Sequence, residues 1–248
     1  MTKYVLFDTE TTGNQDEDRI IQIGAMVVDS KGGIEVYDEL CSTDIDIKVE
    51  AMEVHNITPE LLDGLGSFKA TRFYNDLQSL NNNSNYLIAH NLKFDLGMLE
   101  KEGFENHMQL IDTLRCSKHL MPDSPYHRLQ YFRYSLGLYK QEKQEAQKYN
   151  IEIKAHDALG DVLIMKLLLS KLVSLVKKKY PLSHPMKKLV ELTKQPVMLK
   201  TFRFGKYNGK DIEDVAHQDM GYIKWMYKNM DLDEDMLFTL ENIIERYS

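Results

Sequence analysis

Five short apolar runs, separated by segments with helical spacing, constrain the fold of this chain more than any other feature. The runs have the length of strands and lie at residues 4–10, 20–28, 34–40, 86–90 and 108–113. The segments with helical patterns open at Thr58 and cover 67–80, 93–102, 126–149 and about 158–178. A turn at 29–33 joins the second and third runs as a hairpin. Because strands alternate with helices after that hairpin, we expect one α/β domain over residues 1–178.

A change of composition marks the end of this domain. Residues 177–188 contain five lysines and two prolines, and we interpret residues 179–195 as a basic linker. Residues 196–248 are then expected to form a small α+β module. In it the pair Asn208-Gly209 turns a β-hairpin, and two helices follow at about 219–230 and 233–247. The single tryptophan, Trp225, is expected in the core of this module.

The net charge of −7 is distributed unevenly along the chain. Residues 1–64 carry 15 acids and 4 bases, residues 65–195 carry 13 acids and 20 bases, and residues 196–248 carry 10 acids and 7 bases. Acids that hold divalent cations would offset much of the first excess, so the negative total does not exclude a nucleic-acid partner.

Composition also bears on where the protein acts. No run approaches the roughly 18 uninterrupted apolar residues of a membrane span, and the chain does not begin with the pattern of a signal peptide. Cys41 and Cys116 are too few for a disulfide framework, and we expect both to be reduced. These observations predict a cytoplasmic protein that does not interact with membranes.

The first apolar run carries two carboxylates near its end. Side chains on a strand alternate with period two, so Asp8 and Glu10 leave the same face with Cα atoms about 6 to 7 Å apart. Two acids so placed could share a cation, although acids at a strand end are often simply solvated. Thr11 and Gly13 follow directly, and a glycine there lets the backbone approach a substrate closely.

Two further acids stand at expected helix starts. Asp95 falls in the first turn of the helix after the run at 86–90, where an acid also stabilises the helix dipole. Asp161 lies near the start of the long helix, four residues after Asp157, which could serve as an N-cap. His156 belongs to the preceding loop. Spacing alone leaves each of these residues a purely structural alternative.

In order and spacing, these stretches resemble the three exonuclease motifs of the DnaQ-like, or DEDDh, family of 3′–5′ exonucleases. Asp8 and Glu10 match the first motif, Asp95 matches the second, and His156 with Asp161 matches the His-x-Ala-x-x-Asp form of the third. The resemblance covers residues 1 to about 178 and implies a ribonuclease H-like fold, a mixed five-stranded sheet flanked by helices. The tail resembles the C-terminal module of the exodeoxyribonuclease X subfamily, which extends the match to nearly the whole chain.

The resemblance also implies the chemistry of the site. Its ligands for two Mg²⁺ or Mn²⁺ ions are Asp8, Glu10, Asp95 and Asp161, and carboxylate oxygens suit both metals. His156 is the general base towards the attacking water. Substrate contacts are implied for Thr9, Thr11, Gly13, His55, His90, Asn91 and Phe94. Of these, Phe94 has core packing as an equal alternative.

The function that the resemblance implies is a metal-dependent 3′–5′ exodeoxyribonuclease that releases nucleoside monophosphates from DNA 3′ ends, in DNA repair. Single-stranded ends are the expected substrate, with duplex ends as an alternative. Two other enzymes of the same family are alternatives: a proofreading subunit of a DNA polymerase and a 3′–5′ exoribonuclease. A nucleic-acid-binding protein without activity is a third hypothesis, which the presence of all five motif residues disfavours. The sequence does not specify the oligomeric state.

Overall fold

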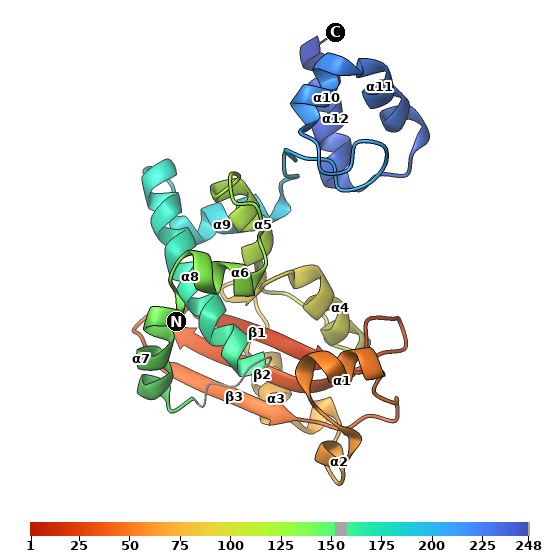
Figure 1. The fold of residues 1–248 in the computed structure, drawn as a ribbon. Helices are drawn as coiled ribbons and strands as arrows, with labels where there is room; N and C mark the ends of the chain where they lie inside the picture. Colours follow the sequence, from red (N-terminus) through yellow and green to blue (C-terminus); the bar gives the residue numbers. More distant parts are fainter. Residues whose placement is uncertain (152–157, 248) are drawn as a thin grey trace. The chain divides into compact units, whose positions relative to one another are not determined.

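The computed structural model describes residues 1–151 and 158–247 of the chain (Figure 1). Contacts between residues divide the chain into two compact units. The first unit comprises residues 1–117 and 125–193, and the second comprises residues 118–124 and 194–248. Asp8, Glu10, Asp95 and Asp161 all lie in the first unit.

A mixed sheet forms the centre of the first unit. Its strands in the described residues are β1 (Lys3–Thr11), β2 (Ile20–Asp29), β3 (Ile34–Leu40), β4 (Tyr86–Ala89) and β5 (Gln109–Asp112). Their order across the sheet is β3-β2-β1-β4-β5. β2 runs antiparallel to β1 and β3, whereas β4 runs parallel to β1 and β5. The expected mixed five-stranded sheet is confirmed.

Helices surround this sheet. They are α1 (Val49–His55), α2 (Pro59–Leu62), the short 3₁₀ turn η1 (Phe68–Ala70), α3 (Arg72–Leu80), α4 (Leu92–Lys101), α5 (Thr113–Leu120), α6 (Leu129–Ser135), α7 (Tyr139–Tyr149), α8 (Ala158–Lys179) and α9 (Pro185–Lys194). α1 and α5 were not predicted from the sequence, because neither is long enough for a clear helical period.

Both faces of the sheet are covered, and the alternation of β1 decides which side chain meets which layer. Val5 and Phe7 point into a core that also contains apolar side chains of α3 and α4. The opposite face receives the long helix α8, which packs across β1 and β2 (Figure 1). β2 is buried continuously from Ile20 to Val27 because it is covered from both sides.

The segment expected as a basic linker, 179–195, is largely helical instead. α9 lies within it, and its Leu189 and Leu192, spaced three residues apart, are buried. The helix belongs to the first unit, since the Thr193 hydroxyl accepts a hydrogen bond of 2.9 Å from the Asp112 amide. The helix is amphipathic, and the high lysine content of the segment obscured this pattern in the sequence.

The second unit is helical and has a core of its own. Its helices in the described residues are α10 (Ile212–Gln218), α11 (Met220–Asn229) and α12 (Glu234–Tyr247). The hairpin expected around Asn208-Gly209 is reduced to an isolated bridge between Thr201 and Asp211. The core includes Phe202, Ile223, Met226, Met236 and Leu240. The expectation that Trp225 is a core residue was wrong, because its side chain is 52% exposed.

Two other expectations concern the chain as a whole. Cys41 and Cys116 are free and buried. Among the described residues, no helix combines the length and the apolar character that crossing a bilayer requires.

Candidate active site

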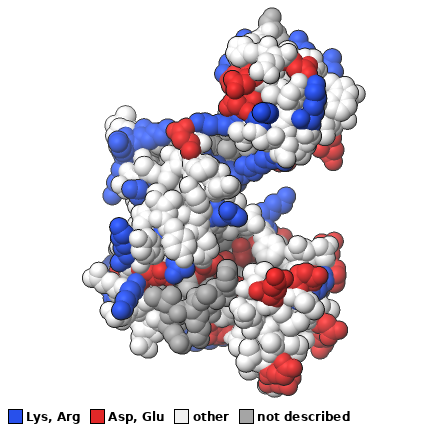
Figure 2. All heavy atoms as spheres, in the orientation of Figure 1, with Lys and Arg blue, Asp and Glu red and all other residues white. Residues whose placement is uncertain are grey.

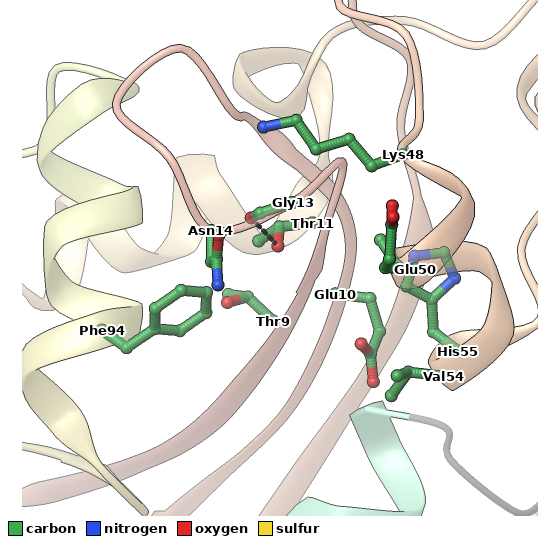
Figure 3. Close-up of a pocket in the computed structure, with 11 residues that line it drawn as sticks. Thr9, Glu10, Thr11, Gly13, Asn14, Lys48, Glu50, Val54, His55 and Phe94 are labelled. Carbon is green, nitrogen blue, oxygen red and sulfur yellow. Dashed lines mark hydrogen bonds between the residues drawn. The ribbon is translucent and has the colours of Figure 1, made fainter.

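The carboxyl end of β1 borders a cavity of about 560 Å³. Glu10 and Thr11 line it from the strand, His55 and Val54 from α1, and Phe94 from α4 (Figure 3). In Figure 3 the Glu10 side chain turns away from Lys48 and towards Val54. Asp8 lies two residues earlier on the same face of β1 as Glu10 and is half-buried. Two carboxylates therefore leave the same face of β1, and Glu10 lines the cavity.

Asp95 contacts β1 from α4, on the face of the sheet opposite to α8. It lies in the first turn of α4, is buried, and its Oδ1 accepts hydrogen bonds from the Thr9 amide at 3.1 Å and the Thr9 hydroxyl at 2.8 Å. Thr9 can serve this role because it points to the opposite face of β1 from Asp8 and Glu10. Burial raises the pKa of Asp95 well above its usual range, against the lowering effect of the bonds from Thr9.

Asp161 is held by a neighbour that the sequence did not reveal. It lies in the first turn of α8, and its Oδ1 accepts a hydrogen bond of 2.5 Å from Gln130 Nε2 of α6. The Gln130 carbonyl in turn accepts a bond of 3.3 Å from Arg133, whose guanidinium forms an ion pair with the buried Glu142 of α7 at 2.8 Å. Four polar side chains thus connect α7, α6 and α8. No motif in the sequence links residue 130 to residue 161.

Gly24 determines how closely α8 approaches β1. It pairs with Asp8 in the antiparallel register, so a side chain at either position would point to the same face. A Cβ atom at residue 24 would lie 2.3 Å from the Ala158 carbonyl carbon, which is too close for any Cβ. The start of α8, and with it Asp161, therefore depends on glycine at this position. A glycine inside a continuously apolar strand was the available sequence signal for such a close approach.

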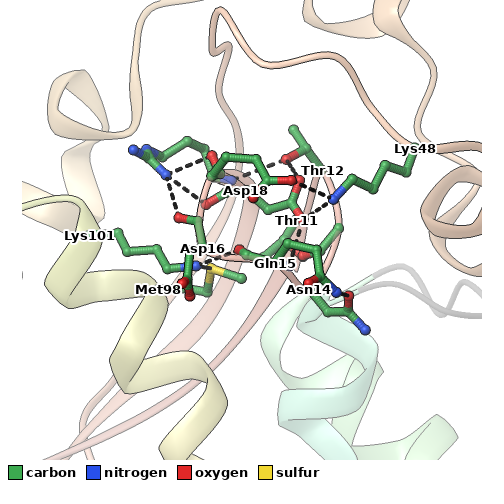
Figure 4. Close-up of polar contacts among 12 residues, drawn as sticks. Thr11, Thr12, Asn14, Gln15, Asp16, Asp18, Lys48, Met98 and Lys101 are labelled. Carbon is green, nitrogen blue, oxygen red and sulfur yellow. Dashed lines mark hydrogen bonds and ion pairs between the residues drawn. The ribbon is translucent and has the colours of Figure 1, made fainter.

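The loop after β1 is anchored by a buried carboxylate. The Asp18 side chain is fully buried and accepts hydrogen bonds from Thr12 Oγ1 at 2.9 Å, from the Gln15 amide at 2.7 Å and from Lys48 Nζ at 2.7 Å (Figure 4). Burial acts to raise the pKa of Asp18, but the hydrogen bonds outweigh it and hold this pKa below its usual range. A Cβ at Gly13 would lie 2.5 Å from Asp18 Oδ2. The loop at the rim of the cavity therefore has one tightly packed arrangement.

His55 offers an unused donor to the cavity. Its Nδ1 accepts a hydrogen bond of 3.0 Å from the Ile57 amide, which assigns the proton of the neutral ring to Nε2. Nε2 is buried and forms no hydrogen bond with the described residues. Burial lowers the pKa of His55, against the raising effect of a weak hydrogen bond with the Thr11 backbone. A buried donor without a partner of good geometry is unusual in a folded protein, and this donor could bind a ligand acceptor.

The other expected substrate residues differ in what the structure offers. Thr11 donates its hydroxyl to the Gly13 carbonyl at 2.7 Å. Asn91 is exposed in the left-handed region, with φ of 78°, at the start of α4. His90 is not among the residues that line the cavity, and its ring nitrogens contact Thr113 Oγ1 and the His127 carbonyl, each at 2.9 Å. Burial lowers the pKa of His90 to about 4. His90 therefore ties β4 to neighbouring segments.

The structure brings the predicted site residues together only in part. The cavity at the end of β1 is lined by Thr9, Glu10, Thr11, Gly13, His55 and Phe94, whereas Asp8 is not among its lining residues. Asp161 borders a different cavity beside α6. Within residues 1–151 and 158–247, no three acidic, histidine or cysteine side chains lie within common reach of a metal ion. His156, the expected general base, lies outside the described residues.

A mixed sheet in this order, with acids at the end of its central strand and on two helices that pack against it, is the architecture of the ribonuclease H-like class. The chain belongs to the Exonuclease family, whose model matches residues 5–169. A second model, the Exodeoxyribonuclease X-like C-terminal family, matches residues 202–231. Members of the Exonuclease family generally use divalent metal ions.

Individual relatives agree with this assignment. Exodeoxyribonuclease 10 of Escherichia coli K12 is 28% identical over 242 residues, which cover 97% of this chain and 98% of the relative. The DNA polymerase III subunit epsilon of Treponema pallidum is 32% identical over 54% of this chain and 65% of its own length. The fold resembles that of Exonuclease X in complex with 5′ overhanging duplex DNA, with a TM-score of 0.54 and 19% identity over 77% of this chain and 99% of that chain.

Proposed function

We propose that this protein is a metal-dependent 3′–5′ exodeoxyribonuclease of the cytoplasm that releases nucleoside monophosphates from DNA 3′ ends during DNA repair. The observation that carries the proposal is the match to Exodeoxyribonuclease 10 over nearly the full length of both chains, C-terminal unit included. The free, buried thiols of Cys41 and Cys116 agree with a reducing compartment.

Asp8, Glu10, Asp95 and Asp161 are the residues proposed to hold two Mg²⁺ or Mn²⁺ ions. All four are carboxylates, the donors that these hard cations prefer, and the only thiols of the chain are buried and form no part of the cavity. Such a metal pair would lower the pKa of a bound water and neutralise charge on the phosphoryl oxygens. The Thr9 bonds to Asp95 and the Gln130 bond to Asp161 are proposed to orient these ligands.

His156 is proposed as the general base. In the sequence it lies two residues before α8 begins and five before Asp161. An imidazole, with an ordinary pKa of about 6.5, suits proton removal from water at neutral pH.

The cavity at the end of β1 is proposed to hold the 3′-terminal nucleotide. His55 supports this best, because it lines the cavity and its Nε2 proton, which forms no hydrogen bond of good geometry with the described residues, would donate to a sugar or phosphate oxygen. Phe94 lines the cavity and would pack against the terminal base or sugar, while Thr11 and Gly13 form its rim. Asn91, exposed beside α4, is kept as a substrate contact. Thr9 lines the cavity and is kept as a substrate contact, although its hydroxyl also binds Asp95. His90 is proposed to act in structure instead, since its ring nitrogens contact Thr113 and His127.

A test of the proposal uses pure protein and matched 3′-labelled DNA and RNA oligonucleotides, single-stranded and duplex. We expect mononucleotides from DNA in Mg²⁺ or Mn²⁺, no release in EDTA, and a loss of several orders of magnitude for Asp8→Asn with folding retained. Activity that persists in EDTA would exclude the metal mechanism. Faster release from RNA than from DNA would favour the exoribonuclease alternative.

A further inference from the structure

The second unit presents aromatic and basic side chains together on its surface. We call this surface the aromatic–basic face and define it by Arg203, Lys210, Tyr222, Lys224, Trp225 and Lys228. The first two residues lie in the loop before α10 and the others on α11. Trp225 is half-exposed, although a tryptophan is the residue that gains most from burial.

The exposure of Trp225 follows from how α11 packs. Ile223 and Met226, three residues apart, fill the core and are fully buried. The two positions between them, Lys224 and Trp225, therefore point outwards. The Trp225 ring stacks on Tyr222, with centroids 6.0 Å apart and planes at 28°. Tyr222 is fixed from behind by the edge of Tyr207, with centroids 5.0 Å apart. The rings therefore form a supported platform.

The loop before α10 is shaped around this platform. Gly205 adopts a positive φ of 74°, and a Cβ there would lie 2.6 Å from the Tyr222 hydroxyl oxygen. The same hydroxyl accepts a hydrogen bond of 3.3 Å from the Lys206 amide. Close packing of a loop against an aromatic ring reduces the entropy that the ring would lose on binding a ligand.

Charge is segregated onto the same side of the unit. Residues 200–210 contain four bases and no acid, and residues 220–230 contain two bases and no acid. Asp219, at the N-cap of α11, forms an ion pair with Lys206, and the other acids lie on or beside α10 and α12 or between α11 and α12. Figure 2 shows blue side chains at the edge where Figure 1 places α11 and red side chains towards α10. Among the described residues, Arg203, Lys210, Lys224 and Lys228 form no ion pair with an acid.

We propose that the aromatic–basic face binds single-stranded DNA, with a nucleobase stacked on Trp225 and the phosphates bound by the surrounding lysine and arginine side chains. The proposal rests on the proposed function, because DNA is then the substrate whose unprocessed part needs a binding surface. Lys228 lies one helical turn after Trp225 on α11, and Lys224 lies one turn before Lys228, so both cations stand on the same side of the ring. Stacking together with backbone charge is how proteins bind single strands without reading their sequence. A duplex hides the faces of its bases and would leave Trp225 unused.

The single tryptophan of the chain makes this face directly observable. In EDTA, which prevents metal-dependent hydrolysis, titration of the full-length protein with an oligothymidylate of about 20 nucleotides should quench tryptophan fluorescence to saturation. By anisotropy, Trp225→Ala should weaken binding by about 5- to 150-fold. The variant Lys224→Gln/Lys228→Gln should make the salt dependence shallower by about 0.7 for each phosphate that is no longer neutralised. Leu237→Ala and Arg246→Gln, on the acidic side at α12, are matched controls and should bind normally.

Hydrolysis of a tetranucleotide in Mg²⁺ separates this inference from the proposed function. Trp225→Ala should retain the parent rate on this short substrate, and a parent protein that does not hydrolyse it would overturn the proposed function alone. The inference is overturned if Trp225→Ala binds the long oligonucleotide as tightly as the parent, or if it loses blunt duplex binding equally. It is also overturned if tryptophan emission changes with the protein concentration and not with the oligonucleotide concentration, because that would indicate contact with a second copy of the protein. Tighter binding of oligouridylate than of oligothymidylate would overturn it as well.

Discussion

Thr9 and Gln130 each hold one of the proposed metal ligands, and they do so from different sides of the sheet. Thr9 gives Asp95 two hydrogen bonds through its amide and hydroxyl, while Gln130 contacts Asp161 with a side-chain amide. Partners of metal ligands commonly change metal affinity by about 10- to 100-fold when they are removed. These two residues therefore belong to the chemistry of the site although neither would touch a metal.

We expect Gln130→Leu to raise the Mg²⁺ concentration needed for half-maximal activity by about 10- to 100-fold, because Asp161 loses the bond that orients it. A metal titration of nuclease activity measures this. Gln144→Leu, an exposed glutamine of α7, is the control and should behave as the parent. An unchanged metal requirement would show that Gln130 does not position Asp161.

His156→Ala should lower kcat by roughly 10²- to 10⁴-fold, the contribution of a positioned general base. KM should change little, and the deficit should shrink at high pH, where hydroxide replaces the missing base. Steady-state kinetics across pH measures both effects, with the exposed His184→Ala as control. A rise in KM at constant kcat would make His156 a binding residue instead.

The proposed catalytic residues could be predicted from the sequence because the order and spacing of the motifs can be recognised without any knowledge of the fold. The partners of these residues could not. Strand alternation shows that Thr9 faces away from Glu10, but only the packed structure shows that α4 brings Asp95 to that face. The contacts of His90 could not be predicted either, because spacing does not reveal that α5 and the loop before α6 occupy both of its ring nitrogens.

At the scale of elements, the contact between α8 and β2 is the most sensitive to change. We expect Gly24→Ala to destabilise the protein by about 1–3 kcal/mol, the usual cost of overpacking, since its Cβ would overlap the Ala158 carbonyl. Activity should fall further than stability, because Asp161 moves with α8. Thermal melting and nuclease assays at a temperature where both proteins are folded measure the two effects.

Gly97→Ala supplies the matched control for this substitution. Gly97 lies within α4, and a Cβ there meets nothing within 4 Å. The change should stabilise the protein slightly, since alanine is favoured over glycine in a helix by up to about 1 kcal/mol. Equal effects of the two substitutions would disprove the steric argument.

The anchored loop after β1 predicts a pH dependence. The folded state lowers the pKa of Asp18 and raises that of Lys48, so the pair stabilises the protein above the unfolded pKa of the carboxyl and below that of the amine. The stabilisation is lost as pH falls through the folded pKa of Asp18. Lys48→Met should lower Tm at pH 7 on the order of 5 °C, and the difference should shrink below about pH 4. Calorimetry against pH tests this, with the exposed Lys31→Met as the control; a pH-independent difference would contradict it.

For the molecule as a whole, the boundary of the first unit has a measurable consequence. A chain of residues 1–195 should retain thermal stability and hydrolysis of a tetranucleotide, because it keeps α9. A chain of residues 1–180 should melt at a lower temperature, since it loses buried Leu189 and the hydroxyl of Thr193 that binds the Asp112 amide. Equal melting temperatures for the two truncated chains would place the boundary before α9.

The division into a large unit and a small C-terminal one agrees with the expectation from sequence, but the details of the second unit differ. Asn-Gly pairs favour tight hairpins, yet Gly209 donates its amide to the Phe202 carbonyl, and the described residues around it form an isolated bridge between Thr201 and Asp211. Trp225 was expected inside because of its size. Ile223 and Met226 fill the available core volume first, and no pattern in a ten-residue helix shows which of three apolar neighbours is left out.

The buried thiols have a practical consequence for spectroscopy. Burial raises the pKa of both Cys41 and Cys116 to about 12, so neither carries an appreciable thiolate fraction at neutral pH. A maleimide dye should therefore not react with either native cysteine and should react with an introduced, exposed one. Leu182→Cys on the first unit and Leu237→Cys on the second would give two exposed attachment points. Energy transfer between dyes at these points would report how the distance between the units changes as a strand is consumed.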